Sequence, residues 1–502
     1  NVAAGTTLQI GAGAVSTLFP TNFVTANISL DPTSTVVYTS TSAMTMSAIP
    51  ATYGHLTMLG ASTKTDGGGT INVTGNINNG VGSSHIGAGK IVLTGGAINH
   101  TLTGTGAYNN LDLNDVNGAT MGASFTVNGE LGLINGAYTL GANTLTLNGT
   151  AINQTAGTMA TTTSSNLVFA PNTNANAGLF IPSSVSDLNS LTINIVASNS
   201  VTLNGALNVN AASNALVLTS GKVITTSSNL LTIVNTAVAA LGGGSANSYV
   251  NGPLARNFPT GLVNISTYRF PIGKADYNQV ELQNLSTSST GTLTAEVFDS
   301  NAGGTFGTGV VEVNTNRYWN ITPSSAFISA INVRLTETVA GVGTANRVTQ
   351  SSTLTGSYNS VGGVSVVGPP PTIASTTAAP GPVNTSLGYF VLGNTGMTYT
   401  SSTVIHPTLT AVAPGGVDQQ LLRIVIVTAA GTPALTLNSI DFSTLGTSDP
   451  IDLLNAKVYS TGASATFSTT TQYGSTFVTP SAAFNVAGSQ ALTAGNNYFW
   501  LT

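Results

Sequence analysis

The stretch Ser124-Phe-Thr-Val-Asn-Gly-Glu-Leu131 decides the fold. Its apolar residues Phe125 and Val127 stand two positions apart, and Thr126 lies between them. Successive side chains of a β-strand point to opposite faces, so this spacing aims the apolar residues at one face and the threonine at the other. An Asn-Gly turn follows, and apolar residues begin again at Leu131. The stretch therefore predicts a short strand with one buried face.

The same pattern recurs along the N-terminal half of the chain. Strands this short cannot bury a face alone, so the repeats predict rungs stacked around a common interior, which is a β-solenoid and most simply a parallel β-helix. The first two copies of each main motif are 54 or 55 residues apart. The repeated segments are Tyr53-Gly-His-Leu-Thr-Met58, Tyr108-Asn-Asn-Leu-Asp-Leu113 and Leu188-Asn-Ser-Leu-Thr-Ile193; Thr70-Ile-Asn-Val-Thr-Gly-Asn-Ile77, Ser124–Leu131 and Ser200-Val-Thr-Leu-Asn-Gly-Ala-Leu207; and Gly141-Ala-Asn-Thr-Leu-Thr-Leu147 and Ser227-Ser-Asn-Leu-Leu-Thr-Ile233.

A second interpretation of the same repeats is a set of antiparallel hairpins. Asn128-Gly129 and Asn204-Gly205 stand between alternating apolar residues, and Asn-Gly in that position is a strong hairpin signal. Helix-forming Glu, Lys, Arg and Gln are scarce, so both interpretations give an all-β protein. The regular repeat favours the solenoid.

Charged side chains are rare in this sequence. The 502 residues include 11 Lys and Arg and 16 Asp and Glu, or 5% of the chain, against about 25% in an ordinary soluble domain. Phosphate recognition needs clustered basic residues, so the composition excludes a nucleic-acid binder. In stacked rungs a charge faces its counterpart about 4.8 Å away, whereas Thr and Asn stack without repulsion and Asn can form ladders. A solenoid therefore accounts for the deficit.

Other counts narrow the class further. Cysteine is absent, which excludes disulfides and thiolate metal sites. No stretch of about 18 uninterrupted apolar residues predicts a membrane-spanning helix.

Composition predicts three domains. The solenoid repeats are expected over residues 1–243, ending at the glycine-rich hinge Leu241-Gly-Gly-Gly244. A β-sandwich is predicted for 244–397, where charges become commoner and alternating runs longer, with Gly368-Pro-Pro-Pro371 as a stiff loop. After a Ser/Thr-rich linker at 398–403, an Ig-like sandwich is predicted for 404–502. Because the sequence stops on an apolar strand, we expect a longer parent protein.

Motifs in the second half resemble those of known secreted proteins. The segments Leu422-Arg-Ile-Val-Ile-Val427, Ala456-Lys-Val-Tyr459, Phe467-Ser-Thr-Thr-Thr-Gln-Tyr-Gly474 and Gly495-Asn-Asn-Tyr-Phe-Trp-Leu501 resemble the accessory domain N-terminal to BNR-repeat neuraminidases. The segments Tyr249-Val-Asn-Gly-Pro-Leu254, Phe270-Pro-Ile-Gly273 and Arg317-Tyr-Trp-Asn-Ile321 are similar to a module of large Bacteroidetes surface proteins. The resemblance implies an exported cell-surface protein, in a lineage that uses type IX secretion. It does not imply sialidase activity, because the catalytic propeller has no counterpart in this sequence.

The titratable residues of the predicted solenoid are candidates for catalytic or metal-binding sites. His55, His85 and His100 lack the short spacings of a zinc site and any recurring acidic partner, so they are interpreted as structural, with Lys64 and Asp66 as loop charges. Asp112 and Asp115 could pair as in a glycosidase, but solvated side chains or turn caps are favoured. The remaining acids are spread along the repeats: Asp31, Glu130 and Asp187.

Three further features of the sequence are candidate binding sites. Asp449-Pro-Ile-Asp452, with Asp418 and Asp441, gives the best oxygen-rich loop for structural calcium, although a turn begun by Asp-Pro is favoured. Gly104-Thr-Gly106 and Gly341-Val-Gly343 lack the third glycine of a dinucleotide loop and predict turns.

Arg317-Tyr-Trp-Asn320 could form an aromatic shelf for a sugar. Strand alternation separates Tyr318 and Asn320 from Arg317 and Trp319, so Trp319, and likewise Trp500, is predicted to anchor a core.

Together these features predict a non-enzymatic extracellular structural or adhesin-like protein, a stalk or filament-forming segment of a larger secreted chain. We expect no catalytic or cofactor-binding residues and no metal other than the calcium considered above. Expected partners are further copies of the chain or other surface proteins, joined through free strand edges, and possible glycans. The alternative is a carbohydrate-binding or accessory region of a secreted glycan-active enzyme. A polysaccharide lyase or hydrolase would need a charged groove that the sequence does not predict.

Overall fold

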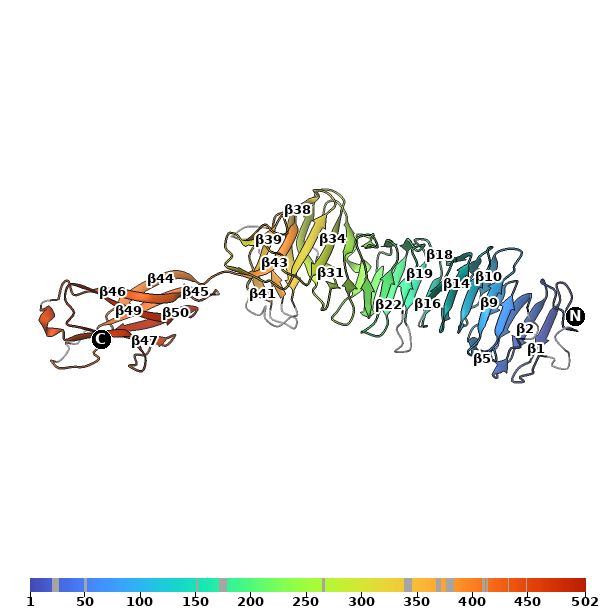
Figure 1. Ribbon diagram of the computed structural model, residues 1–502, viewed down its shortest axis with the longest axis horizontal. Helices are drawn as coiled ribbons and strands as arrows, with labels where there is room; N and C mark the ends of the chain where they lie inside the picture. Colours follow the sequence, from blue (N-terminus) through green and yellow to red (C-terminus); the bar gives the residue numbers. More distant parts are fainter. Residues whose placement is uncertain are drawn as a thin grey trace.

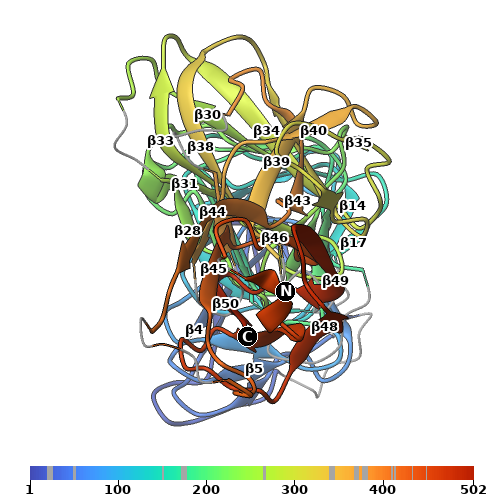
Figure 2. The same cartoon turned by 90° about the vertical axis from the view of Figure 1, so that its left-hand side faces the viewer.

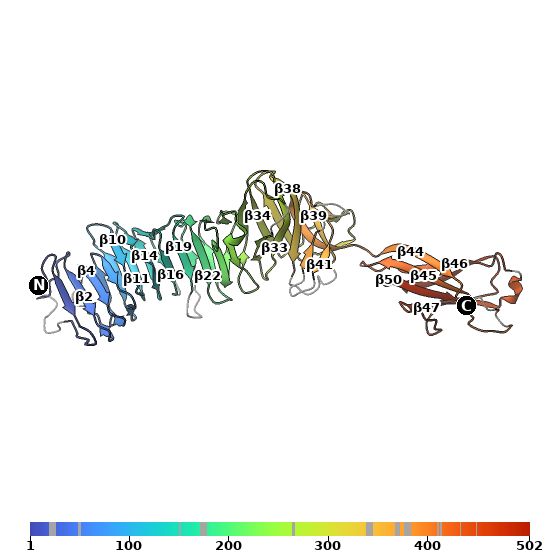
Figure 3. The ribbon, with the colours of Figure 1, turned by 180° about the vertical axis from the view of Figure 1, so that it is seen from behind.

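The chain forms an elongated all-β molecule, seen from opposite sides in Figures 1 and 3. The N-terminus lies at one end, and the last domain lies at the other (Figure 1). Figure 2 looks along the long axis from the C-terminal side, with that last domain in front of the coils. The computed structural model describes residues 1–19, 27–48, 52–149, 152–170, 178–263, 267–337, 345–366, 372–375, 383–408, 411, 414–431, 433–447 and 449–502.

The first part is a β-solenoid, as the repeats predict. Among the described residues, every pair formed between two strands of β1 to β30 is parallel. Leu111 pairs with Leu131 and Leu131 with Ile152, so one turn takes about 20 residues. The 54-residue spacing of the motifs therefore spans more than one turn.

Each face of the coil is one sheet, in which strands from successive turns are neighbours. The first face contains β1 (Thr7–Ile10), β2 (Thr35–Thr39), β4 (His55–Leu59), β7 (Ile77–Asn79), β10 (His100–Thr103), β12 (Ala119–Met121), β15 (Ala137–Thr139) and β18 (Thr158–Ala160). The second contains β6 (Thr70–Val73), β9 (Lys90–Thr94), β11 (Leu111–Asn114), β14 (Leu131–Asn135) and β17 (Ile152–Gln154), and a short one contains β3 (Met44–Thr45), β5 (Thr63–Thr65) and β8 (Ser84–Ile86).

Three more sheets carry the coil towards the next domain. One contains β13 (Phe125–Val127), β16 (Thr144–Leu147), β19 (Asn166–Phe169), β22 (Ser190–Asn194), β25 (Leu216–Ser220) and β28 (Leu241–Gly243). Another contains β20 (Phe180–Ile181), β23 (Ser200–Leu203), β26 (Lys222–Ile224), β29 (Val250–Asn251) and β32 (Ile272–Gly273). The last begins with β21 (Asp187–Leu188), β24 (Leu207–Val209), β27 (Leu231–Ile233) and β30 (Leu254–Phe258). A 3-10 helix, η2 (Val238–Ala240), follows β27 in the chain.

Register places like residues above one another. Thr126 pairs with Thr146 on the outer face, where threonine stacks without charge repulsion. Asn148 Nδ2 donates to Asn128 Oδ1 at 3.0 Å, which confirms that asparagine forms ladder bonds between turns. The inward column is apolar and buried: Phe125, Leu145, Leu167, Leu191, Leu216 and Leu241.

The Asn-Gly pairs are corners of the coil rather than hairpins. Asn128-Gly129 joins β13 to β14, and these strands belong to different sheets. The next corner stacks directly on this one, because a Cβ on Gly149 would lie 1.5 Å from the carbonyl oxygen of Gly129. Glycine is thus required here by close approach of the backbone, a role that sequence alone does not distinguish from a hairpin turn.

The glycine-rich segment at 241–244 is not a hinge. Leu241–Gly243 forms β28, and Leu241 pairs with Leu216 of the preceding turn. Parallel pairing passes beyond the predicted boundary at 243, since Leu254 pairs with Leu231 and Ile272 with Val250. The glycines allow tight stacking, because a Cβ on Gly243 would lie 2.0 Å from the Leu218 oxygen.

The middle domain is a sandwich of two sheets. One sheet continues directly from solenoid strand β30 through β34 (Gly291–Phe298), β37 (Tyr318–Pro323), β43 (Gly388–Asn394), β39 (Arg347–Ser351), β40 (Ser357–Ser360) and β35 (Thr305–Phe306), with β36 (Glu312–Val313) also paired to β43. The other contains β31 (Tyr268–Phe270), β33 (Val280–Thr287), β38 (Ile328–Thr336), β42 (Thr372–Ala374) and β41 (Val364–Val366). Among the described residues, the strands of this domain pair antiparallel except for β35 with β40, which are parallel. The predicted loop at 368–371 lies outside the described residues.

The last domain also pairs two antiparallel sheets, of unequal size. One contains β44 (Thr398–Ile405), β45 (Leu422–Ala429), β50 (Gly495–Leu501), β47 (Asn455–Gly462) and β48 (Gln472–Val478), and the other contains β46 (Thr436–Ser443) and β49 (Ala483–Ala491). The Ser/Thr-rich segment predicted as a linker is strand β44, because its backbone pairs with β45 on both sides of a bulge between Tyr399 and Ser401.

Candidate functional site

The first of two buried clusters in the solenoid corrects the prediction that Lys64 and Asp66 are loop charges. Lys64 and Asp66 are buried, and the structure gives His85 the acidic partner that the sequence did not reveal. His85 Nε2 lies 3.0 Å from Asp66 Oδ2, and its Nδ1 accepts a hydrogen bond from the Asn109 amide at 3.2 Å. The ring is therefore a neutral Nε2–H tautomer held between two fixed groups.

Lys64 pairs in register with His85 in the next turn. Its Nζ donates to the Ser62 hydroxyl at 2.6 Å and to the Ser40 carbonyl oxygen at 3.1 Å. Burial lowers the pKa of Lys64. The polar groups of His85 and Lys64 thus form hydrogen bonds within the solenoid, and we interpret this cluster as structural.

The second cluster contains His100, Asp115, Asp112 and Lys90. His100 Nε2 lies 3.0 Å from Asp115 Oδ2, and Asp115 also accepts from the Gly96 amide at 2.5 Å. Burial raises the pKa of the Asp115 carboxyl, but hydrogen bonds from backbone amides and His100 outweigh it, so the pKa is lowered overall. Asp112 is buried and bound instead to Lys90 at 2.6 Å. The two acids therefore bind different partners, and Asp115 is a turn cap, as predicted, but a buried one.

The other candidates of the solenoid stay apart. His55 Nδ1 accepts from the Asn76 amide, while Asp31 caps a turn at Thr33. Glu130 and Asp187 each accept from an asparagine of a neighbouring turn. Within the described ranges, no three His, Asp or Glu side chains gather as a metal site.

His85 is expected to make the solenoid sensitive to pH. Burial lowers its pKa, against the raising effect of Asp66, so the unfolded chain takes up this proton first as pH falls. Stability should therefore decline as pH falls below about 6.5, the ordinary histidine value. Urea denaturation at several pH values between 8 and 5 should show this fall in the free energy of unfolding. The His85→Gln variant should be less stable than the parent at pH 8, and its free energy of unfolding should change less with pH. His55→Gln is the matched control; an unchanged slope in His85→Gln would contradict the assignment.

The four acids proposed for calcium are not brought together. Asp449 caps the 3-10 helix η3 (Pro450–Asp452) by accepting from the Ile451 amide at 3.1 Å, which confirms the Asp-Pro turn. Asp441 accepts from Asn485, and Asp418 binds Lys457 and Tyr459. Of the two glycine loops, 341–343 lies outside the described residues.

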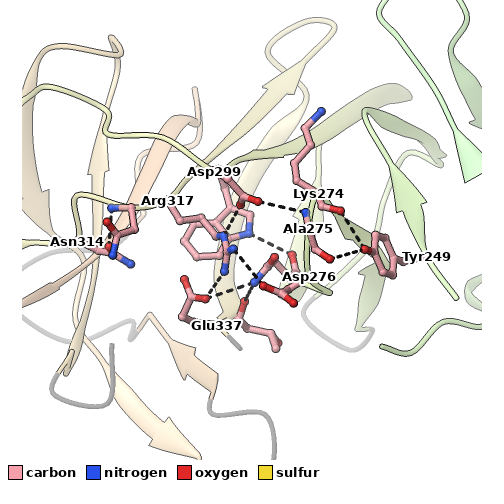
Figure 4. Close-up of polar contacts among 12 residues, drawn as sticks. Tyr249, Lys274, Ala275, Asp276, Asp299, Asn314, Arg317 and Glu337 are labelled. Atoms are coloured by element: carbon pink, nitrogen blue, oxygen red, sulfur yellow. Dashed lines mark hydrogen bonds and ion pairs between the residues drawn. The ribbon is translucent and has the colours of Figure 1, made fainter. Parts of the chain in front are cut away.

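Arg317 forms the most charged buried cluster of the middle domain (Figure 4). Its Nε lies 2.8 Å from Asp299 Oδ1, its Nη1 binds Glu337, and its Nη2 lies 3.9 Å from Asp276 Oδ2. We call Arg317, Asp276, Asp299 and Glu337 the junction cluster. Asp276 follows solenoid strand β32, whereas the other three belong to the sandwich, so the pair between Arg317 and the 51% exposed Asp276 is the contact of this cluster that reaches the solenoid.

Neighbouring contacts reinforce the same joint. The Ala275 amide donates to Asp299 at 3.1 Å, and the Tyr249 hydroxyl lies 2.9 Å from the Lys274 carbonyl oxygen (Figure 4). Arg256 of β30 is buried and donates to the carbonyl oxygens of Arg269 and Ala237 at 3.0 and 3.1 Å. Burial lowers the pKa of Arg256 to about 10, so it stays charged at neutral pH.

The aromatic shelf proposed for 317–320 does not exist as a surface. Trp319 is fully buried and its Nε1 donates to the Asn278 carbonyl oxygen, so it anchors the core as predicted. Trp500 is also buried, in agreement with the prediction, but it packs against Phe467 and not within the main apolar cluster of the last domain. Strand alternation turns Phe499 inward and Trp500 outward, where Phe467 covers it with ring centroids 5.5 Å apart.

Two hollows of the surface could not be predicted from the sequence, because they are formed by loops and strand edges that are far apart in the chain. A groove of about 700 Å³ runs between β44 and β46, lined by apolar residues such as Val404, Ile424 and Ile440. In the described part of the chain each of these two strands pairs with a single neighbour. The expectation that copies join through free edges stays a prediction. A smaller hollow of about 490 Å³ lies beside β35, β36 and β43.

No known relative assigns a role to these features. Comparison with protein-family models, curated proteins and solved structures finds no match. Among the described residues, no helix is long and apolar enough to cross a membrane.

Proposed function

We propose that this protein is a rigid spacer in an extracellular surface protein. One observation carries the proposal: a single apolar core runs without a break from Ile10 in the first turn to Leu392 in the middle domain. Interiors pack as densely as crystals, so a core shared between two domains resists bending. The solenoid has about 11 turns, and at about 4.8 Å per turn it alone spans roughly 50 Å.

The backbone and the charges support the same role. The sheet that begins with β21 in the solenoid continues through β30 into β34 of the sandwich. The junction cluster lies at the same boundary, which its ion pair between Arg317 and Asp276 crosses. The C-terminal domain has a separate core, which includes Ile424, Val458 and Phe499. The proposed rod therefore consists of the solenoid and the middle domain, and it presents the last domain.

The surface location and an adhesin-like role rest on the sequence. The likeness of residues 422–501 to accessory domains of secreted enzymes supports export. An uncharged, threonine-rich exterior suits a stacked structural element better than a binder of ionic ligands.

Single-particle electron microscopy tests the rod. The angle between the solenoid and the middle domain should fall in one narrow distribution. Insertion of eight Gly and Ser residues at Gly396, between the two cores, should broaden only the angle of the last domain and serves as the control. Free bending between β30 and β34 would exclude a rigid spacer.

A further inference from the structure

The hollow beside β35, β36 and β43 has the composition of a ligand site. Its volume of about 490 Å³ falls in the range of small-molecule pockets. Side chains of one aromatic residue, one acid and several amides line it. We call it the asparagine pocket, after its lining residues Asn301, Phe306, Glu312, Asn314, Asn316 and Asn394.

Phe306 presents an aromatic ring at this pocket. Its side chain is 58% exposed, although burial of aromatic rings is a main source of stability elsewhere in this domain. The backbone beneath it is fixed, because the Thr305 amide donates to the Gly356 oxygen and the Gly307 amide to the Tyr358 oxygen, both at 2.9 Å. A ring held in this way offers a flat apolar surface to a ligand.

The polar groups are oriented before any ligand arrives. Asn394 is 4% exposed, and its Nδ2 donates to Glu312 Oε2 at 2.9 Å. The Asn316 amide donates to Asn314 Oδ1 at 2.8 Å, and the Gly303 amide donates to Asn301 Oδ1 at 2.9 Å. These bonds hold one carboxylate and three amides around the pocket, which reduces the entropy lost on binding.

Two buried amide atoms in this lining lack partners. Asn394 Oδ1 and Asn314 Nδ2 form no hydrogen bond with any described residue. Such groups are rare in folded proteins because each costs free energy. A ligand that both donates and accepts would satisfy the pair.

We propose that the asparagine pocket binds one residue of a neutral glycan. A sugar ring has an apolar face that stacks on Phe306 and hydroxyls that bond Glu312 and the amides. No Lys or Arg is among its described lining residues, and Glu312 repels anions, so sialylated and sulfated sugars are disfavoured. Glycan binding at this pocket does not depend on the rigidity of the rod, and it would give the spacer a binding function of its own.

A glycan array carrying neutral glucose-, galactose-, mannose- and N-acetylglucosamine-terminated probes, together with sialylated and sulfated probes, tests the proposal. The full chain should bind at least one neutral class and prefer it to the anionic probes. Phe306→Ala and the near-isosteric Glu312→Gln should each weaken that binding about tenfold or more. Tyr399→Ala, whose side chain is 59% exposed on β44, and Asp452→Asn are matched controls that should leave it unchanged.

Three results would overturn the proposal: no neutral probe bound, a preference for anionic probes, or binding that survives both pocket substitutions. Circular dichroism of each variant checks that the fold is retained. Because Phe306 and Glu312 are exposed, the variants should keep the rigid angle measured by electron microscopy. Failure of the pocket and failure of the rod are therefore separate outcomes.

Discussion

Replacing Arg317 by leucine should lower the free energy of unfolding by about 3–5 kcal/mol, the range for removing one partner of a buried ion pair. The side chain of Glu337 is 2% exposed, so the substitution leaves a buried carboxylate without its neighbouring guanidinium. Denaturation in urea, followed by tryptophan fluorescence, measures the loss. In a Trp500→Phe background Trp319 is the remaining tryptophan and reports on the middle domain, since the sequence has two.

Two control variants distinguish the loss of a buried ion pair from the loss of an exposed one, and from the effect of an unpaired buried charge. Lys274→Leu removes a partly exposed pair with Glu296 in the same region, whose side chains are 31% and 22% exposed, and should cost at most about 1 kcal/mol. Arg317→Leu combined with Glu337→Leu should recover much of the loss, because the stranded charge is gone. A cost of the single variant no larger than that of Lys274→Leu would contradict the assignment of Arg317 and Glu337 as a stabilising buried ion pair.

Replacing Leu167 by alanine should cost about 2–5 kcal/mol, the range for a buried leucine whose removal leaves a cavity. Leu167 lies in the middle of the inward column, between Leu145 and Leu191 of the adjacent turns. Its neighbours are held by parallel ladders on both sides, so the walls of the cavity cannot readily collapse. Urea denaturation of the full chain is the measurement.

Thr146→Ala is the matched control for this column. Thr146 lies on the opposite, outer face, beside Leu145, and its loss should change stability by no more than about 0.5 kcal/mol. Equal costs for the two variants would contradict the inward assignment of Leu167.

Much of the solenoid could be predicted from local pattern. The two-residue spacing of Phe125 and Val127 sets which side chains turn inward, whatever the partner strands are. The turn after Val127 was ambiguous, since Asn-Gly suits a hairpin and a coil corner alike; only the pairing of β13 with β16 decides between them. The glycines at 241–244 predict a hinge wrongly for the same reason. Glycine occurs both in flexible segments and where two backbones stack closely, and the sequence alone does not distinguish these roles.

The candidate sites were less predictable, because their members are distant in the chain. Asp66 and His85 are separated by a whole turn of the coil, so their pairing depends on the register between β5 and β8. The junction cluster and the asparagine pocket likewise combine residues from several loops and strands. No spacing rule in the sequence relates such residues.

An all-β chain of stacked repeats with few charges can be predicted from the sequence, because strand alternation and like-charge repulsion between turns act on neighbouring residues and leave a visible pattern. The end of the coil, the continuation of its core into the middle domain and the burial of particular polar groups are known from the three-dimensional structure. These properties depend on register and packing between distant segments. Arg317 shows the difference: the sequence places it on a strand beside Trp319, and the fold surrounds it with three acids.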